Sequence, residues 1–210
     1  MDATPAQLGD RELYNILLSA VGPRPIAWVS SLSADGQPNL APFSFFNVAC
    51  ADPPLLAFAP SMRAPRTSEA AAGVPKDTLR NIRETREFVV NIVTFELAEA
   101  MNLTSGDYDS TVDEFEIAKL GAVPSKLVRP QRVADSPVSF ECKLYQILDF
   151  NPGPDGGSLV IGEIVSIHVD EDYLKEGRLD RNSLDLIGRM GGIQYTRTTE
   201  RFEIVRPKVG

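Results

Sequence analysis

The sequence predicts a mainly β protein, a β-barrel with helices at its periphery. Several short segments alternate apolar and polar residues with a period near two, which is typical of half-buried strands. The longest two, residues 138–150 and 158–169, flank the turn cluster at residues 151–157, so we expect them to form an antiparallel hairpin. Helical periodicity is confined to short stretches, and many short strands with few helices favour a barrel.

The length and composition bound the class of protein. A chain of 210 residues suits one sizeable core, and we expect residues 1–210 to form a single domain. The net charge is -8 and no basic run is present, which argues against nucleic acid as the main partner. No apolar run is long enough to span a membrane, and the N-terminus lacks a signal-peptide layout. A cytoplasmic location is therefore expected.

The elements follow one another in a definite order. Asp10 is a candidate N-cap for a first helix, which Gly22 and Pro23 should end. Residues 24–47 then predict two strands joined by a turn with Asp35-Gly36 at its apex, because glycine supplies the positive φ that such turns need. The later expectations are strands at residues 54–59, 88–94, 138–150, 158–169 and 201–205, and helices at residues 76–83, 95–105 and 114–120.

The sequence lacks the residue patterns that a metal site or a catalytic triad needs. Cys50 and Cys142 are far apart, with no CxxC or Cys/His cluster, so we expect two reduced thiols that serve as small apolar residues. The single histidine, His168, is interpreted as a strand-edge residue, because no GxSxG elbow is present. Acidic pairs such as Asp113 and Glu114 are interpreted as solvated loop charge. The glycine-rich residues 188–198 match no nucleotide-binding pattern and suit either a close backbone approach or a flexible connector.

The segment Pro75-Lys76-Asp77-Thr78 is a candidate anion site at the start of a helix. A helix N-terminus presents free N–H groups and a partial positive charge, to which Lys76 adds a cation and Thr78 a hydroxyl. Arg63 in the preceding loop extends this set toward a terminal phosphate. The alternative is an ordinary capped helix, with Asp77 or Thr78 as the N-cap.

Residues 39–47, NLAPFSFFN, form a second candidate binding surface. Their proline cannot donate to a strand ladder, and backbone groups with Ser44 and Asn47 can face a flat, polar-edged ligand. An ordinary barrel corner explains the same pattern. Trp28 and the pair Phe45 and Phe46 are more typical of a core than of a stacking platform.

Taken in order, these pieces resemble the flavin reductase-like family, the FMN-binding split-barrel flavoproteins. The resemblance is carried by RPIAWVS at residues 24–30 with the Asp-Gly turn, NLAPFSFFN at 39–47, DPP at 52–54, KDTLRNI at 76–82 before FVVNIV, and GRMGG with a tyrosine after it. It covers about residues 12–207. Several two-component flavin reductases of the family carry a late histidine beside the flavin, and the late loop here has none.

The resemblance implies a six-stranded antiparallel split β-barrel of Greek-key type with peripheral helices, in a homodimer that holds FMN near the dimer interface. It also implies hydride transfer from NADH or NADPH to FMN, with onward delivery to an electron acceptor or partner oxygenase and no catalytic side chain. The implied FMN-binding residues are Trp28, Ser30, Ser31, Ser44, Phe45, Phe46 and Asn47 around the ring and ribityl chain, Arg63, Lys76, Asp77 and Thr78 at the phosphate, and Arg189 and Tyr195 closing the pocket. An electron carrier without nicotinamide activity and a flavin-free interaction module are the alternatives.

Overall fold

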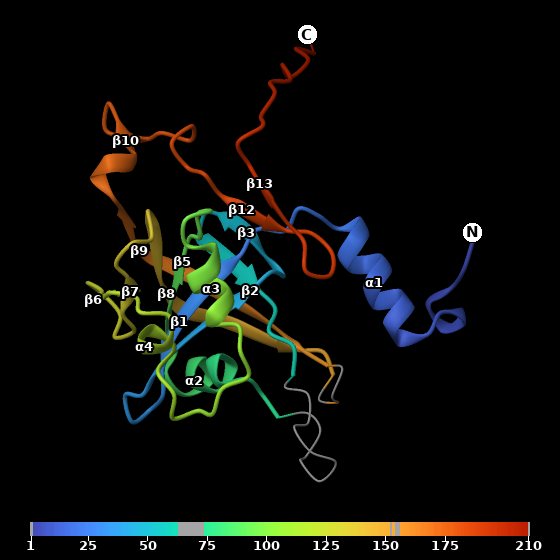
Figure 1. The fold of residues 1–210 in the computed structure, drawn as a ribbon, viewed down its shortest axis with the longest axis horizontal. Helices are drawn as coiled ribbons and strands as arrows, with labels where there is room; N and C mark the ends of the chain where they lie inside the picture. The colour runs from blue at the N-terminus through green and yellow to red at the C-terminus, as the bar shows by residue number, and fades with distance from the viewer. Residues whose placement is uncertain (1, 63–73, 152, 154–155, 210) are drawn as a thin grey trace.

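A computed structural model of the chain, which describes residues 2–62, 74–151, 153 and 156–209, is built around one large antiparallel sheet (Figure 1). Its seven strands are ordered β2-β1-β5-β8-β9-β4-β3. They are β1 (Ala27–Leu32), β2 (Pro38–Phe43), β3 (Phe46–Ala51), β4 (Pro54–Phe58), β5 (Glu87–Asn91), β8 (Val138–Asp149) and β9 (Ser158–Val169). The predicted mainly β, antiparallel class is confirmed, with one more strand in the sheet than the six expected.

The two edge strands of this sheet are neighbours along the chain. β2 ends at Phe43 and β3 begins at Phe46, so only Ser44 and Phe45 lie between them. Three residue steps span at most about 11 Å. The sheet must therefore curl until its edges approach each other at this point, which makes an open barrel with a seam at Ser44 and Phe45.

Both predicted hairpins are present. β1 pairs with β2 from Ala27 opposite Phe43 to Leu32 opposite Pro38, and Gly36 in the connecting turn has the expected positive φ of 89°. β8 and β9 pair along their whole lengths, with register shifts after Glu141 and Leu144 that bend this long ribbon.

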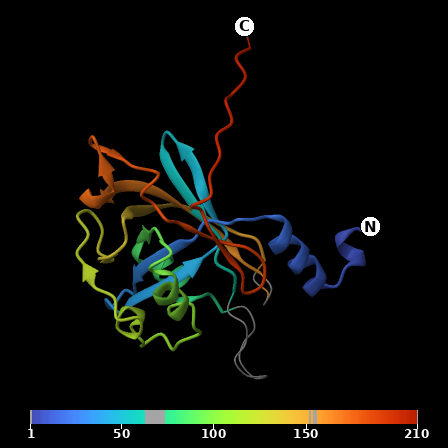
Figure 2. The same ribbon diagram turned by 45° about the horizontal axis from the view of Figure 1, so that its top comes forward.

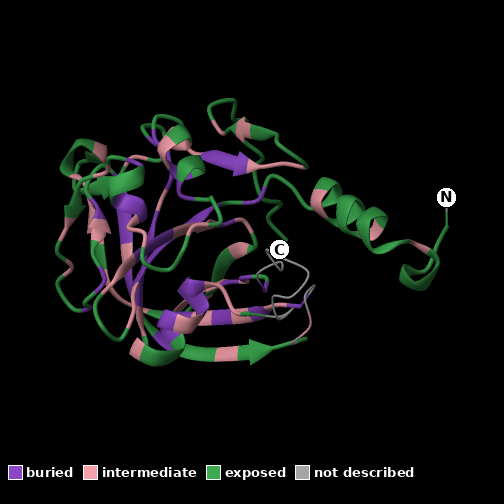
Figure 3. Cartoon of the chain, turned by 60° about the horizontal axis from the view of Figure 1, so that its bottom comes forward, coloured by how far each residue is buried: buried purple, intermediate pink, exposed green. Residues whose placement is uncertain are grey.

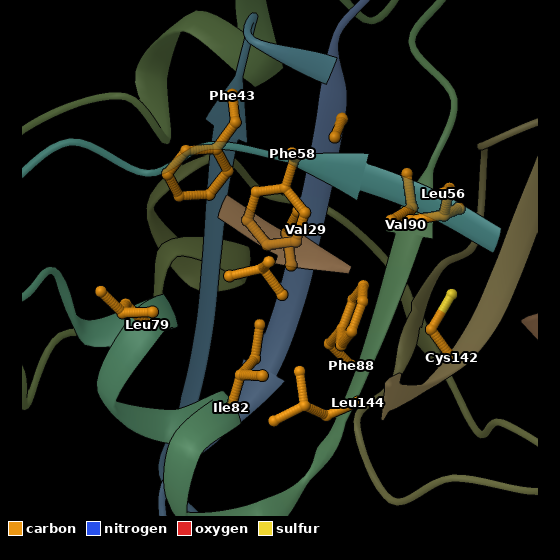
Figure 4. Packing of buried hydrophobic residues seen from close by; sticks show 12 residues of the cluster. Val29, Phe43, Leu56, Phe58, Leu79, Ile82, Phe88, Val90, Cys142 and Leu144 are labelled. Atoms are coloured by element: carbon orange, nitrogen blue, oxygen red, sulfur yellow. The ribbon is translucent and has the colours of Figure 1, made fainter. Parts of the chain in front are cut away.

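The hydrophobic residues of β1 divide between two clusters because successive side chains point to opposite faces. The barrel cluster is seen in Figure 4 and contains Ala27, Val29, Phe43, Leu56, Phe58, Leu79, Ile82, Phe88, Val90, Cys142, Leu144 and Val160. The outer cluster contains Ile26, Trp28, Leu40, Val93, Leu97, Met101, Phe115, Val133 and Ile187. Both faces of β1 are therefore covered, and its side chains are buried from residue 27 to residue 31.

Short helices cover the barrel. α2 (Asp77–Thr85) packs Leu79 and Ile82 into the barrel cluster (Figure 4). α3 (Ala98–Leu103) and α4 (Glu114–Ile117) are shorter than the predicted helices at residues 95–105 and 114–120. The minor elements are 3-10 turns at Pro5–Gln7 and Glu171–Tyr173 and the short strands β6 (Ala122–Val123), β7 (Arg132–Val133), β10 (Leu174–Lys175) and β11 (Arg178–Leu179).

The two ends of the chain project from the barrel (Figures 1 and 2). α1 (Asp10–Ala20) follows Gly9, which occupies the N-cap position expected for Asp10, and buries no residue (Figure 3). The predicted strand at residues 201–205 is wrong, because this exposed segment pairs with no strand. The last strands are instead β12 (Ile187–Arg189) and β13 (Tyr195–Arg197), which turn the glycine-rich segment into a small hairpin.

Candidate functional site

Two adjoining cavities lie along β2 and share the lining residues Pro42 and Ser105. The first, called here the α2 cavity, has a volume of about 380 Å³ and lies between β2, the start of α2 and the loop at residues 104–108. The second, called the arginine cavity, has a volume of about 220 Å³ and lies at the seam, between the end of α1 and the β12–β13 hairpin. Together they have the size of a small-molecule site.

Lys76, Asp77 and Thr78 line the α2 cavity, so the structure brings the predicted anion-binding segment to a hollow beside β2. Lys76 occupies the N-cap position of α2, and neither Asp77 nor Thr78 is the cap. The Nζ of Lys76 lies 5.7 Å from the centre of the Phe43 ring. The Asp77 carboxylate lies 2.6 Å from the Arg80 guanidinium, which offsets its negative charge. A helix N-terminus with a lysine at its cap favours an anion.

Buried hydrogen bonds hold the wall of the α2 cavity in place. The Nδ2 of Asn39 on β2 donates to the Oγ1 of Thr78 at 2.9 Å. The Nδ2 of Asn81 donates to the Oγ of Ser31 at 3.2 Å, which ties the same helix to β1. These bonds fix the first turn of α2 against β1 and β2.

A buried carboxyl group also lines the α2 cavity. Glu114 is 7% exposed, and its Oε2 accepts a hydrogen bond from the Leu40 N–H at 3.0 Å. Burial, followed by repulsion from Asp113 and Asp77, raises the pKa of Glu114 to about 7, although the Leu40 bond acts in the opposite direction. The interpretation of this pair as solvated charge is thus wrong for Glu114, and half-buried Asp113 caps α4 by accepting from the Phe115 N–H.

Ser44, Phe45, Arg189 and Tyr195 line the arginine cavity, as does Arg24, which was not among the predicted site residues. The seam exposes 47% of Phe45, although this residue lies between two barrel strands. Arg189 donates to the Tyr195 hydroxyl, and its Cζ lies 4.5 Å from the centre of that ring. The predicted residues of the late loop therefore meet those of the seam.

Five of the predicted residues line neither cavity: Trp28, Ser30, Ser31, Phe46 and Asn47. The three on β1 are buried because both faces of that strand are covered. The Nε1 of Trp28 donates to the Oγ1 of Thr104 at 2.8 Å and so supports the loop that walls the α2 cavity. Phe46 packs against the barrel cluster, and Asn47 is exposed on β3. The predicted Arg63 lies outside the described residues.

Other chemistry is limited within the described part of the chain. No group of three or more His, Cys, Asp or Glu could hold a metal ion there. No helix of that part is long and apolar enough to cross a membrane. His168 is half-buried on β9 and lines neither cavity. Cys50 and Cys142 are free, as expected, and burial strongly raises the pKa of the Cys142 thiol.

Comparison with known proteins identifies the family. The model of the flavin reductase like domain matches residues 20–184, which include all seven strands of the large sheet and the α2 cavity but not Arg189 and Tyr195 of the arginine cavity. The chain belongs to the flavin reductase-like family. An uncharacterized protein of Halalkalibacterium halodurans is 35% identical over 211 residues, which cover 100% of this chain and 98% of that protein. The predicted family and the split-barrel fold class are confirmed.

Two solved structures of similar proteins extend this flavin reductase-like match over nearly the whole chain. Pseudomonas fluorescens 2-nitrobenzoate 2-nitroreductase is 36% identical with a TM-score of 0.85, covering 99% of this chain and 96% of that one. Nitrilotriacetate monooxygenase component B from Bacillus cereus is 31% identical with a TM-score of 0.88, covering 97% and 98%.

Proposed function

We propose that this chain is an FMN-dependent oxidoreductase, which takes hydride from NADH or NADPH and passes electrons to an acceptor or to a partner oxygenase. The observation that carries the proposal is the shape and charge of the two adjoining cavities. One end has a helix N-terminus with Lys76, and the other has aromatic rings at an open seam. This arrangement suits a ligand with an anionic tail and a flat ring, and membership of the family favours a flavin.

The groups around the α2 cavity fit the phosphate of FMN. Lys76, the Thr78 hydroxyl and the first turn of α2 would hold the phosphate oxygens. Three carboxyl groups line this cavity, those of Asp77, Asp107 and Glu114. Asp77 is paired with Arg80, and the raised pKa of Glu114 limits its charge near neutral pH. Repulsion of a phosphate is reduced accordingly.

Bound FMN would supply the hydride chemistry, so the chain itself needs no catalytic acid or base. Its residues would bind the anionic tail at α2 and place the ring near Pro42 and Ser105, where the two cavities adjoin, with the arginine cavity beside it. The partly exposed seam would leave one side of the site accessible to a nicotinamide ring. The position of His168, away from both cavities, agrees with a reaction that does not use it.

We propose two alternative kinds of electron acceptor. The name of the Bacillus cereus neighbour, a monooxygenase component, favours delivery of electrons to a partner oxygenase. The name of the Pseudomonas fluorescens neighbour, a nitroreductase, favours direct reduction of a small aromatic compound. Product analysis with and without an added oxygenase component distinguishes the two.

We further propose a homodimer. α1 and the C-terminal tail expose large apolar side chains, including Leu17 at 50%, Phe202 at 84% and Ile204 at 81%. Apolar surface gathered on projecting segments is typical of an interaction site. Sedimentation equilibrium of the purified chain tests this, and a monomer at micromolar concentration would contradict it.

Anaerobic mixing of the FMN-loaded protein with NADH or NADPH tests the oxidoreductase itself. We expect the flavin absorption band to bleach with one or both reductants. If FMN binds tightly but neither nicotinamide bleaches it, the protein is an electron carrier. If the purified protein takes up no added FMN, it is a flavin-free module and the proposed function is wrong.

A further inference from the structure

Two arginines oppose each other in the arginine cavity. The N–H of Arg24 donates to the carbonyl of Arg189 at 2.9 Å, and the N–H of Arg189 donates to the carbonyl of Arg24 at 2.8 Å. Like charges directly opposite each other on antiparallel segments destabilise the pairing. The backbone thus holds two cations together in a position that folding alone does not favour.

The guanidinium of Arg24 is buried among neutral groups. Only 6% of Arg24 is exposed, and its two Nη atoms donate to the carbonyls of Leu18 at 2.6 Å, Val21 at 2.5 Å and Met190 at 2.5 Å. Its Nε is buried and has no hydrogen-bond partner among the described residues. A buried charge without a counter-ion is costly, so its retention points to a negative group that arrives from outside the chain.

The cavity supplies no negative group of its own. None of the described residues that line it is acidic. Arg189 likewise donates to neutral partners, the Tyr195 hydroxyl and the Gly192 carbonyl. Some other arginines of the described chain have carboxylate partners, namely Arg80 with Asp77, Arg83 with Asp149 and Arg197 with Asp185, whereas Arg86 and Arg201 also donate to neutral groups. Arg24 and Arg189 differ from these in lying together in one cavity that has no acidic residue in its described lining.

The walls indicate the shape of the missing anion. The Cζ of Arg24 lies 6.0 Å from the centre of the Phe45 ring, and Tyr14 and Tyr195 also line the cavity. Guanidinium groups bind carboxylates in a planar, two-pronged manner, and aromatic side chains stack on flat rings. A volume of about 220 Å³ restricts the occupant to a small molecule.

We propose that Arg24 and Arg189 bind the carboxylate of a small aromatic acid. The binding of this anion does not depend on the proposed function. The assignment separates the two ends of the site: the α2 cavity takes a phosphate, and the arginine cavity takes a carboxylate beside the ring.

Calorimetric titration with benzoate, and with benzamide as its uncharged counterpart, tests the proposal on the chain with and without FMN. We expect benzoate to bind both forms, and benzamide to bind at least about tenfold more weakly, the scale of a lost charge-assisted contact. Arg189→Gln should weaken benzoate by a similar factor. Arg197→Gln is the matched control, because Arg197 pairs with Asp185, and should leave benzoate binding unchanged. Arg24→Lys is a second variant. It keeps a positive charge beside the buried carbonyls that accept from Arg24, which a neutral replacement would not.

The outcomes separate this inference from the proposed function. Equal binding of benzoate to the wild type and to both arginine variants would overturn the inference, as would equal binding of benzamide. If benzoate and FMN compete, the cavity holds the flavin ring and the inference is wrong. If Arg189→Gln loses affinity for NADPH but not for NADH, Arg189 binds the additional phosphate of NADPH, and the inference is again wrong. Arg189-dependent benzoate binding to a protein that takes up no FMN would support the anion site and refute the proposed oxidoreductase.

Discussion

Replacing Glu114 by glutamine should change how the stability of the protein depends on pH. Burial raises the pKa of Glu114 from 4.5 to about 7 in the folded chain. A carboxyl group whose pKa is higher in the folded state stabilises that state fully below pH 4.5, and this contribution is lost as the pH rises through 7. The difference between these two pKa values corresponds to a loss of at most about 3 kcal/mol in the free energy of unfolding.

Glutamine retains an oxygen that can accept from the Leu40 N–H but carries no charge, so Glu114→Gln should lack this part of the pH dependence. Asp113 and Asp77, which face the same carboxyl group, are present in both proteins and affect both profiles. We therefore expect the variant to gain stability relative to the wild type, by up to about 3 kcal/mol, between about pH 5 and pH 8.

Urea unfolding of the flavin-free protein at several pH values measures this difference. Glu116→Gln is the matched control, because Glu116 belongs to the same short helix but is exposed. Its profile should run parallel to that of the wild type. A parallel profile for Glu114→Gln as well would show that the carboxyl group is already ionised at low pH, and the reasoning from burial would fail.

Two more outcomes follow from the cavity walls and from the core. Lys76→Ala should weaken FMN binding by about 1–3 kcal/mol in a fluorescence titration. Lys175→Ala on exposed β10 is the control and should leave FMN affinity unchanged. Equal affinities of the two variants would show that α2 does not bind the phosphate. A thiol reagent should modify the partly exposed Cys50 in the native protein and leave Cys142 intact, because burial raises the pKa of that thiol; rapid labelling of both by mass spectrometry would contradict the packing of the barrel.

The parts of the fold that sequence predicts well are those whose signals are local. Residues 138–150 and 158–169 alternate cleanly around a turn cluster, and the observed β8 and β9 match them within a residue. The turn with Asp35-Gly36 adopts the positive φ at Gly36 that its composition requires. The placement of Lys76 and Thr78 beside the cavity follows from the same kind of signal, a helix start.

What the sequence does not disclose depends on contacts between distant segments. Period two on β1 suggests one buried face, but residues between 93 and 133 cover the other, so Trp28 and Ser30 are interior as well. Ser31 is buried on the face that α2 covers. Glu114 resembles solvated charge until α4 is seen to lie against β2. Alternation at residues 201–205 resembles a strand, but a strand needs an edge to pair with, and the described chain provides none there.

If Arg24 binds the proposed anion, its link to α1 gives the amino-terminal helix a part in ligand recognition. The carbonyls of Leu18 in α1 and of Val21 at its C-cap accept from the guanidinium, yet α1 buries none of its own residues. Such a helix has little packing to keep it ordered, and its amide hydrogens should exchange readily with solvent. Thermodynamic reciprocity then requires that any molecule whose affinity depends on the ordered helix also protects that helix. Slower deuterium uptake across Asp10–Ala20 would thus report that a ligand has bound to Arg24 in the arginine cavity.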